Sequence, residues 1–223
     1  MIEWYDLNED VALALVDPPE IDEETQTQVG LNWEGELKAN PNLTKGPIYA
    51  LDKITPEVIR LYQTDYSYVL AARKIPKLDI SAMAVTGLTI CPEGLVLGRR
   101  SSLVVNTPNL WEPAPAGGLS QLDLHAQLFE ELEEELGLTS KDCARPKVIG
   151  GVYDGSTFDV VLSLKTALSF SALEGIFQSS SRDEYDAIRL LPFDQFDAFL
   201  QKETDSSLEI LPVILKEFQK LNN

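Results

Sequence analysis

The stretch that decides the fold is Gly117–Leu138, GGLSQLDLHAQLFEELEEELGL. Leucine recurs within it at every fourth position, at Leu124, Leu128, Leu132 and Leu136. That spacing places the four side chains on one face of a helix. Gly137 follows the last leucine and predicts the helix end, because glycine tolerates the left-handed conformation there. We therefore predict a helix over residues 124–136, preceded by a pair of glycines.

The same helix carries a cluster of acids toward its C-terminal end, at Glu130, Glu131, Glu133, Glu134 and Glu135. Three of them, Glu131, Glu134 and Glu135, have i, i+3, i+4 spacing and point the same way. Like charges at this spacing destabilise a helix by roughly a few tenths of a kcal/mol per pair, and the helix dipole disfavours them near this end. A divalent cation would reverse both effects, because Mg²⁺ binds carboxylate and carbonyl oxygens together with water and substrate phosphates. The alternative is a solvated acidic face.

The stretch resembles the Nudix box, G-x5-E-x7-R-E-U-x-E-E-x-G-U, in which U is an aliphatic residue. Residues 131–138 read E-L-E-E-E-L-G-L and fit the second half of this pattern. The first half departs from it. Glu130 stands where the family has arginine, the interval from Gly118 to this position is two residues shorter, and Asp123 is its only acid. The upstream glutamate and the arginine support each other in the family, so the departure leaves open what orients Glu131.

The resemblance implies a metal-dependent hydrolase that cleaves a nucleoside diphosphate linked to another moiety. Mg²⁺ or Mn²⁺ ions, in a number that the sequence leaves open, would be held by Glu131, Glu134 and Glu135, with Gly118 as a further metal-binding candidate. The metal would neutralise the phosphates and lower the pKa of a bound water. Glu134 is the candidate base that accepts the proton of this water, and Glu131 is the second catalytic candidate.

The segments ahead of the box supply candidates for substrate binding. A strand predicted over residues 95–100 ends with Arg99 and Arg100, and strand residues alternate between faces, so only one of these arginines can face the cleft. The approach to the box, L-W-E-P-A-P-A-G-G, resembles the family's W-E-x-P-G-G. This resemblance makes Trp111 and Gly117 the remaining candidates, since small residues let backbone carbonyl oxygens approach a metal or phosphate.

A second, looser resemblance concerns the segment that begins at Trp33, W-E-G-E-L-K-A-N-P-N-L-T-K-G-P, followed later by T-D-Y at residues 64–66. It is similar to the N-terminal region of the eukaryotic UDP-glucose/UDP-galactose diphosphatase group of Nudix proteins, whose box also lacks the usual arginine. The resemblance implies a UDP-sugar substrate that is cleaved to UMP and sugar 1-phosphate. Tyr62, Tyr66 and Trp111 are the candidates for stacking on a base. Ordinary packing and turn residues are the alternative reading.

Composition excludes several classes of protein. The net charge of −18 argues against a nucleic-acid binder, because no basic stripe could release phosphate counterions. Residues 1–37 hold eleven acids and no Lys or Arg, so the other 186 residues carry only −7. The sequence contains no run of eighteen apolar residues, so it predicts no membrane span. The first residues do not have the pattern of a secretory signal. Cys91 and Cys143 predict reduced thiols in a cytoplasmic protein.

The remaining segments give a coarse order of elements. Strands are predicted over residues 11–16, 84–90, 95–100, 147–153, 158–164 and 184–192. Helices are predicted from Thr55 or Pro56 to Tyr62, and over 194–201 and 208–221. Residues 17–28 read as a connecting loop, and residues 173–181 are ambiguous. His125 is the single histidine and reads as a structural or rim residue.

This order indicates an α+β fold, because runs of strands rather than βαβ units dominate. The resemblance makes it a Nudix-type α/β/α sandwich with a mixed central sheet, with residues 1–79 as an acidic N-terminal extension and residues 80–223 as the Nudix-like domain. Two other functions stay open: a catalytically silent domain that binds a nucleotide or regulates, and an acidic helix without a Nudix fold that docks a basic partner. The sequence leaves open whether the acidic residues 1–37 complete the pocket or cover the surface of a homodimer.

Overall fold

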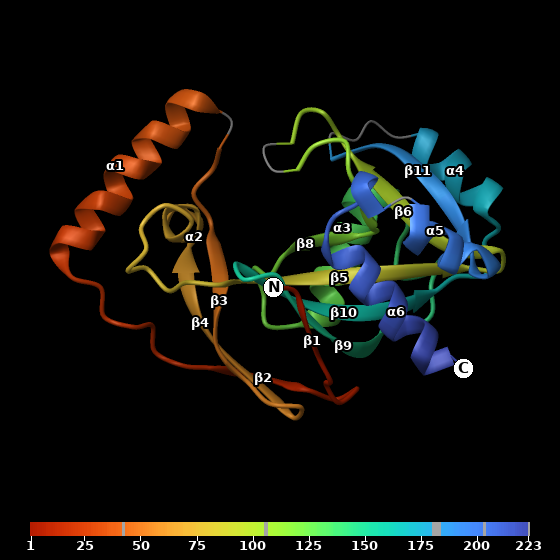
Figure 1. Ribbon diagram of the computed structural model, residues 1–223, viewed down its shortest axis with the longest axis horizontal. Helices are drawn as coiled ribbons and strands as arrows, with labels where there is room; N and C mark the ends of the chain where they lie inside the picture. The colour runs from red at the N-terminus through yellow and green to blue at the C-terminus, as the bar shows by residue number, and fades with distance from the viewer. Residues whose placement is uncertain (42, 105–106, 180–183, 203, 223) are drawn as a thin grey trace.

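The computed structural model describes residues 1–41, 43–104, 107–179, 184–202 and 204–222 (Figure 1). The strands are β1 (Glu3–Tyr5), β2 (Ala12–Leu15), β3 (Pro47–Ile54), β4 (Val58–Asp65), β5 (Ala82–Cys91), β6 (Gly94–Arg100), β7 (Trp111–Pro113), β8 (Ala116–Gly118), β9 (Lys147–Tyr153), β10 (Thr157–Lys165) and β11 (Tyr185–Pro192). The helices are α1 (Glu23–Ala39), α2 (Tyr66–Ala72), α3 (Leu124–Leu136), α4 (Phe170–Gln178), α5 (Phe196–Lys202) and α6 (Ile210–Asn222).

The central strands form a mixed sheet that runs through most of the chain. Its main path has the order β1-β9-β10-β5-β3-β4-β2, and β6 joins β5 to β7 and β11. The two middle strands, β5 and β10, are parallel and pair from Ala82 opposite Thr157 to Ile90 opposite Lys165. β8 pairs with β5 in antiparallel orientation, which places the glycine pair of the box at the centre of the sheet.

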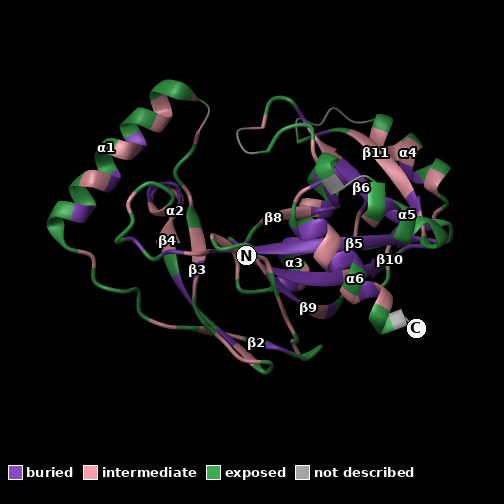
Figure 2. Cartoon of the chain, viewed as in Figure 1, coloured by how far each residue is buried: buried purple, intermediate pink, exposed green. Residues whose placement is uncertain are grey.

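Helices cover both faces of this sheet, as the sandwich prediction requires. On one face, the buried leucines of α3 pack against side chains of β5 and β10, including Met83, Val85 and Phe158. On the other face, α5 and α6 pack against a second set that includes Leu88 and Val161. Figure 2 shows the burial concentrated in β5, β10 and α3, while the outer side of α1 is exposed. The α+β prediction is therefore confirmed.

The N-terminal part is joined to the sheet at two places. β1 pairs with β9 and forms one end of the sheet, and β3 meets β5 where Ala50 lies opposite Ala82. Figure 1 shows α1, α2, β3 and β4 grouped to one side of the molecule, with α1 outermost. Strands on the two sides of residue 79/80 therefore pair in one sheet. The division of the chain into two parts at this position stays a prediction.

The prediction of a loop over residues 17–28 is wrong from Glu23 onward, where α1 begins. Asp22 caps this helix, and its Oδ1 accepts the backbone N–H of Thr25 at 2.8 Å. Acids in a first helical turn are favoured by the helix dipole, so the acid-rich composition marks a helix start here. The helix is held by burial of Val29 and Trp33.

The predicted helix from residue 55 to 62 is also wrong, because this segment is a turn followed by β4. Thr55 does act as a local cap, but of a turn: its Oγ1 accepts the backbone N–H of Val58 at 3.0 Å. β4 then pairs with β3 on one side and with β2 on the other. Hydrogen bonds from two neighbouring strands outweigh a weak local helix signal.

The other predicted helices and strands agree with the structure within a few residues. Asp123 caps α3 by accepting the N–H groups of His125 and Ala126 at 2.9 and 3.1 Å. Gly137 ends this helix in the left-handed conformation, with φ 75°. Most of the ambiguous segment 173–181 belongs to helix α4, which is capped by Ser169, while residues 180 and 181 lie outside the described residues.

Candidate active site

Helix α3 and strand β8 bring two glutamates against the glycine pair. The carboxyl group of Glu131 lies so close to Gly117 that a Cβ added at this glycine would stand 2.1 Å from the carboxyl carbon. Glu135 is buried, and its Oε2 accepts the backbone N–H of Ala116 at 3.0 Å. Both side chains therefore face β8, while Glu134 is exposed on the same turn of α3.

A residue that the sequence analysis missed holds Glu131. Gln127 is 2% exposed, and its Nε2 donates to Glu131 Oε1 at 2.8 Å. The Oε1 atom of Gln127 accepts both the backbone N–H and the hydroxyl of Ser120, each at 2.9 Å. The available signal was the i, i+4 spacing of Gln127 and Glu131, which places both on one face of the helix.

The position of the missing arginine is occupied differently. Glu130 is exposed, and its Oε2 accepts a hydrogen bond from Gln121 Nε2 at 3.0 Å. A hydrogen bond between an amide ahead of the helix and a carboxylate on it therefore stands at the arginine position, and it does not involve Glu131. This pair lies at the surface, since the side chain of Glu130 is exposed and that of Gln121 is half-buried.

The carboxylates near β8 are held in surroundings that favour protonation. Burial raises the pKa of Glu131 to about 7, the bond from Gln127 opposes this shift, and the charge of Glu134 adds to it. Burial also raises the pKa of Glu135 well above its usual range, and the charges of Glu184 and Glu112 add to the effect. The pKa of Glu184 is raised by burial and by Glu134, while Arg100 opposes the shift. Positive charge at this site would relieve these interactions.

The donor atoms of these residues are oxygens of the kind that a divalent cation binds. The Oε1 atom of Glu135 is buried and lacks a well-formed hydrogen bond among the described residues, with the buried Tyr185 close to its side chain, and the space that a Cβ of Gly117 would fill is taken by a carboxylate. No group of three Asp, Glu, His or Cys side chains within the described ranges is arranged to hold an ion by itself. Mg²⁺ commonly uses one or two carboxylates and takes its other ligands from water and phosphate, so the site suits an open metal position.

A cleft of about 590 Å³ opens beside the glycine pair. Its described lining comprises Leu43, Thr44, Gly46, Pro47, Ile48, Tyr66, Gly118, Ser120 and Glu184. One wall therefore belongs to the N-terminal part of the chain, and the other carries Gly118 and Glu184. Of the aromatic candidates for base stacking, Tyr66 lies in this cleft, whereas Tyr62 is buried at 4% exposure and lines another cavity.

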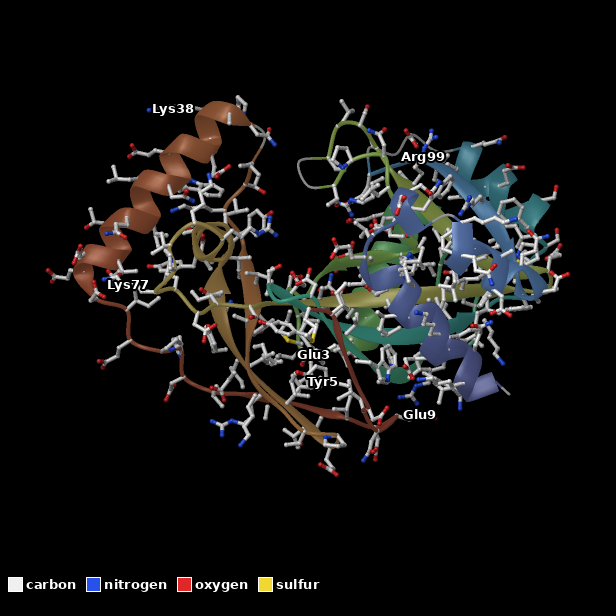
Figure 3. The ribbon with its side chains drawn as sticks, viewed as in Figure 1. Glu3, Tyr5, Glu9, Lys38, Lys77 and Arg99 are labelled. Atoms are coloured by element: carbon white, nitrogen blue, oxygen red, sulfur yellow. The ribbon has the colours of Figure 1, made fainter. Side chains whose placement is uncertain are left out.

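The predicted substrate-binding residues, Arg99, Arg100, Trp111 and Gly117, all lie outside the described lining of this cleft, which includes the neighbouring Gly118. Arg99 Nε pairs with Asp186 Oδ1 at 2.7 Å, beside β11 (Figure 3). Arg100 Nη1 pairs with the buried Glu112 at 2.7 Å. The two arginines have different partners, and neither is in the described lining of the cleft, so the expectation that one of them faces it stays a prediction.

Trp111 lies next to Arg99 rather than over the cleft. The guanidinium carbon of Arg189 is 4.5 Å from the centre of its ring, and that of Arg99 is 5.8 Å away. These cation–π contacts stabilise the ring in its place. Gly117 contributes by letting Glu131 approach, so its role here is spatial.

Other sequence features lie away from this site. His125 is at the start of α3 and lines a separate cavity of about 310 Å³. Cys91 and Cys143 are free thiols. Within the described ranges, none of the helices combines the length and the apolarity that crossing a bilayer requires.

Comparisons with known proteins identify the fold. No protein-family model matches the chain, and no curated protein matches it in sequence. The structure of DR0079 from Deinococcus radiodurans is similar with a TM-score of 0.51 and 14% identity, over 76% of this chain and 97% of that one. A bifunctional NMN adenylyltransferase/ADP ribose pyrophosphatase from Francisella tularensis, complexed with AMP and a manganese ion, matches with a TM-score of 0.50 and 16% identity, over 71% of this chain and 47% of that one.

A nudix hydrolase family member from Chromobacterium violaceum has a TM-score of 0.46 and 15% identity, over 64% of this chain and 79% of that one. At these identities a likeness shows how the chain folds and not what it does. Together with the layers and the sheet described above, the likeness to DR0079 shows that the chain has the Nudix-type α+β fold.

Proposed function

We propose that this protein is a Nudix hydrolase, a metal-dependent pyrophosphohydrolase that cleaves a nucleoside diphosphate linked to another moiety. The observation that carries the proposal is the placement of Glu131 and Glu135 against β8, beside a cleft of about 590 Å³. A diphosphate is large enough and charged enough to need such a cleft with a metal between it and the glutamates. The Francisella structure that shares this fold holds AMP and a manganese ion.

Mg²⁺ or Mn²⁺ would be held by Glu131, Glu134 and Glu135, with the carbonyl oxygen of Gly118 as a further ligand. When bound, the metal neutralises the phosphates and lowers the pKa of a water molecule. The raised pKa values of Glu131 and Glu135 support this assignment, because a buried carboxylate gains most from a nearby cation.

In the proposed reaction, water attacks one phosphorus and the bond from that phosphorus to the bridging oxygen breaks. Glu134, exposed on α3 next to the glutamates that face β8, accepts the proton of the attacking water. The bridging oxygen leaves with the second phosphoryl group, so two phosphomonoesters result. Gly118 and Ser120, at the mouth of the cleft, lie where the diphosphate would pass.

The cleft also supports a proposal about the remainder of the substrate. Leu43, Pro47 and Ile48 offer apolar surface, and Tyr66 offers an aromatic ring on which a nucleobase can stack. A UDP-sugar, cleaved to UMP and sugar 1-phosphate, is the substrate that we place first.

The test is release of phosphate, after phosphatase treatment of the products, from a panel of UDP-sugars, ADP-ribose, dinucleotides and NADH. We expect turnover that requires Mg²⁺ or Mn²⁺ and stops with a chelator. Glu134→Gln should lower kcat by about 10²-fold or more, the size expected for loss of a general base. Glu133→Gln, on the same turn, is the matched control. No release from any substrate with either metal would refute the proposal.

A second candidate is a domain that binds the nucleotide without cleaving it. It is favoured by Glu130 at the arginine position and by the lack, among the described residues, of three side chains that converge on one ion. In that case UMP or ADP-ribose should raise the melting temperature by mass action, with no product formed over hours. Metal-dependent product formation excludes this alternative.

The compartment and the assembly are further parts of the proposal. Two free cysteines support a reducing compartment, and we place the protein in the cytoplasm. The net charge of −18 supports a protein without nucleic-acid partners. A homodimer stays a prediction that sedimentation analysis can test.

A further inference from the structure

We propose that Gln127 is the positioning residue of this site, and that it fixes the carboxylate of Glu131 in place of the arginine and glutamate that the box lacks. The inference rests on the proposed function, in which Glu131 binds the metal. It is carried by three hydrogen bonds, by burial, and by the close approach of Gly117.

The hydrogen bonds fix which end of the Gln127 amide meets Glu131. The backbone N–H of Ser120 can only donate, and it lies 2.9 Å from Gln127 Oε1. Exchanging the amide oxygen and nitrogen would bring two donors together at this contact, so the assignment follows from the network. The nitrogen therefore faces Glu131 Oε1 at 2.8 Å, where an ionised carboxylate accepts it.

Glu131 is held from two sides. Gln127 donates to Oε1 of Glu131, and the carboxyl group packs against Gly117 in the space that an added Cβ would fill. Gln127 itself is 2% exposed and anchored by two donors on Ser120, so it has little freedom to follow a moving carboxylate. A carboxylate fixed in this way is prepared for a metal before the metal arrives.

The other amide–carboxylate pair of the helix is placed differently. Gln121 Nε2 donates to Glu130 at 3.0 Å, but this contact is exposed to solvent. A solvent-exposed hydrogen bond exchanges readily with water and fixes little. Glu130 is exposed, and the hydrogen bond of this pair does not reach Glu131, so the pair stands at the arginine position without holding Glu131.

The experiment compares Gln127→Met with the matched variant Gln121→Met, each of which removes one amide donor to a neighbouring glutamate. For Gln127→Met we expect kcat to fall roughly 10- to 100-fold, as for removal of a partner that orients a metal ligand, with KM within about twofold. The Mg²⁺ concentration for half-maximal activity should rise by a similar factor. Gln121→Met should keep both quantities within about twofold of wild type.

A second variant separates positioning from a merely structural role. Gln127→Glu keeps the shape and the acceptor for Ser120, and at pH 9, where the new group is ionised, it cannot donate to Glu131. If Gln127 only anchored Ser120, this variant would behave as wild type; we expect it to be at least as impaired as Gln127→Met. It also serves if Gln127→Met fails to fold.

The stabilisation of the protein by Mg²⁺ gives a readout that does not depend on turnover. We expect the rise in melting temperature with Mg²⁺ to be reduced in Gln127→Met and Gln127→Glu and preserved in Gln121→Met. If the wild type turns over substrate and the Gln127 variants have the same kcat and the same response to Mg²⁺, this inference is overturned while the proposed function stands. A wild type with neither turnover nor a response to Mg²⁺ would overturn the proposed function, and this inference with it.

Discussion

Gly117→Ala is the substitution that tests the site most directly, because it acts on Glu131 without touching that residue. The φ angle of Gly117 is not in the left-handed region, so alanine fits the backbone. The added Cβ would lie 2.1 Å from the carboxyl carbon of Glu131 and 2.2 and 2.5 Å from its oxygens. No other atom is among its three nearest neighbours, so the strain falls on one flexible side chain.

The size of the effect follows from these distances. Ordinary contact begins at 3.4 Å, so the carboxyl carbon must retreat from 2.1 Å by about 1.3 Å. This movement stretches the 2.8 Å bond from Gln127 beyond hydrogen-bonding range. Misplacement of a catalytic group by about 1 Å can lower a rate by roughly 100-fold, which corresponds to about 2.7 kcal/mol. The cost in stability is smaller, about 1–2 kcal/mol for the lost bond, and is partly offset by the lower entropy of the unfolded alanine chain.

The assay is kcat and KM with the best substrate of the panel, together with urea unfolding of the same preparations. Gly175→Ala, on α4 with nothing within 4 Å of its added Cβ, is the matched glycine control. We expect Gly117→Ala to lose about 100-fold in kcat while it keeps most of its unfolding free energy. Activity within threefold of wild type would refute the claim that the position of Glu131 beside β8 matters for turnover.

Two further predictions concern buried charges away from the cleft. Burial raises the pKa of Asp159 from 3.8 to about 6. The contribution of this group to the unfolding free energy is therefore fully present below pH 3.8, where the carboxyl group is protonated, and is lost as pH rises through 6. Asp159→Asn keeps an acceptor for Thr86 and should raise the unfolding free energy at pH 8 by roughly 2–3 kcal/mol, with no change near pH 3.5; an equal change at both pH values would contradict this. Arg100→Met leaves the carboxylate of Glu112 buried without its partner at 2.7 Å, and should cost about 3 kcal/mol at pH 8 by urea unfolding. The loss should shrink at pH 5, because burial raises the pKa of Glu112 to about 7 and the group then takes up a proton; a loss independent of pH would count against this account.

Some features of the fold were legible in the sequence because they depend on neighbours along the chain. The four leucines of α3, its cap at Asp123 and its end at Gly137 are all set within one or two helical turns. The same holds for the hairpin of β5 and β6 and for the shared direction of Glu131 and Glu135. Local rules were misleading where the chain acquires distant partners. β4 is a strand because β2 and β3 form backbone hydrogen bonds with it. The sequence of residues 55–62 does not indicate which distant strands these will be.

The sequence by itself determined that a helix with clustered carboxylates follows a glycine pair in an α+β fold. Only the tertiary structure decided how these carboxylates are held. Gln127 orients Glu131 because Ser120 fixes its amide, Arg100 is engaged by Glu112, and Tyr66 reaches the cleft because the N-terminal part folds across β5. Helical periodicity is a property of consecutive residues, whereas a hydrogen bond or a cleft wall depends on atoms that only packing brings together.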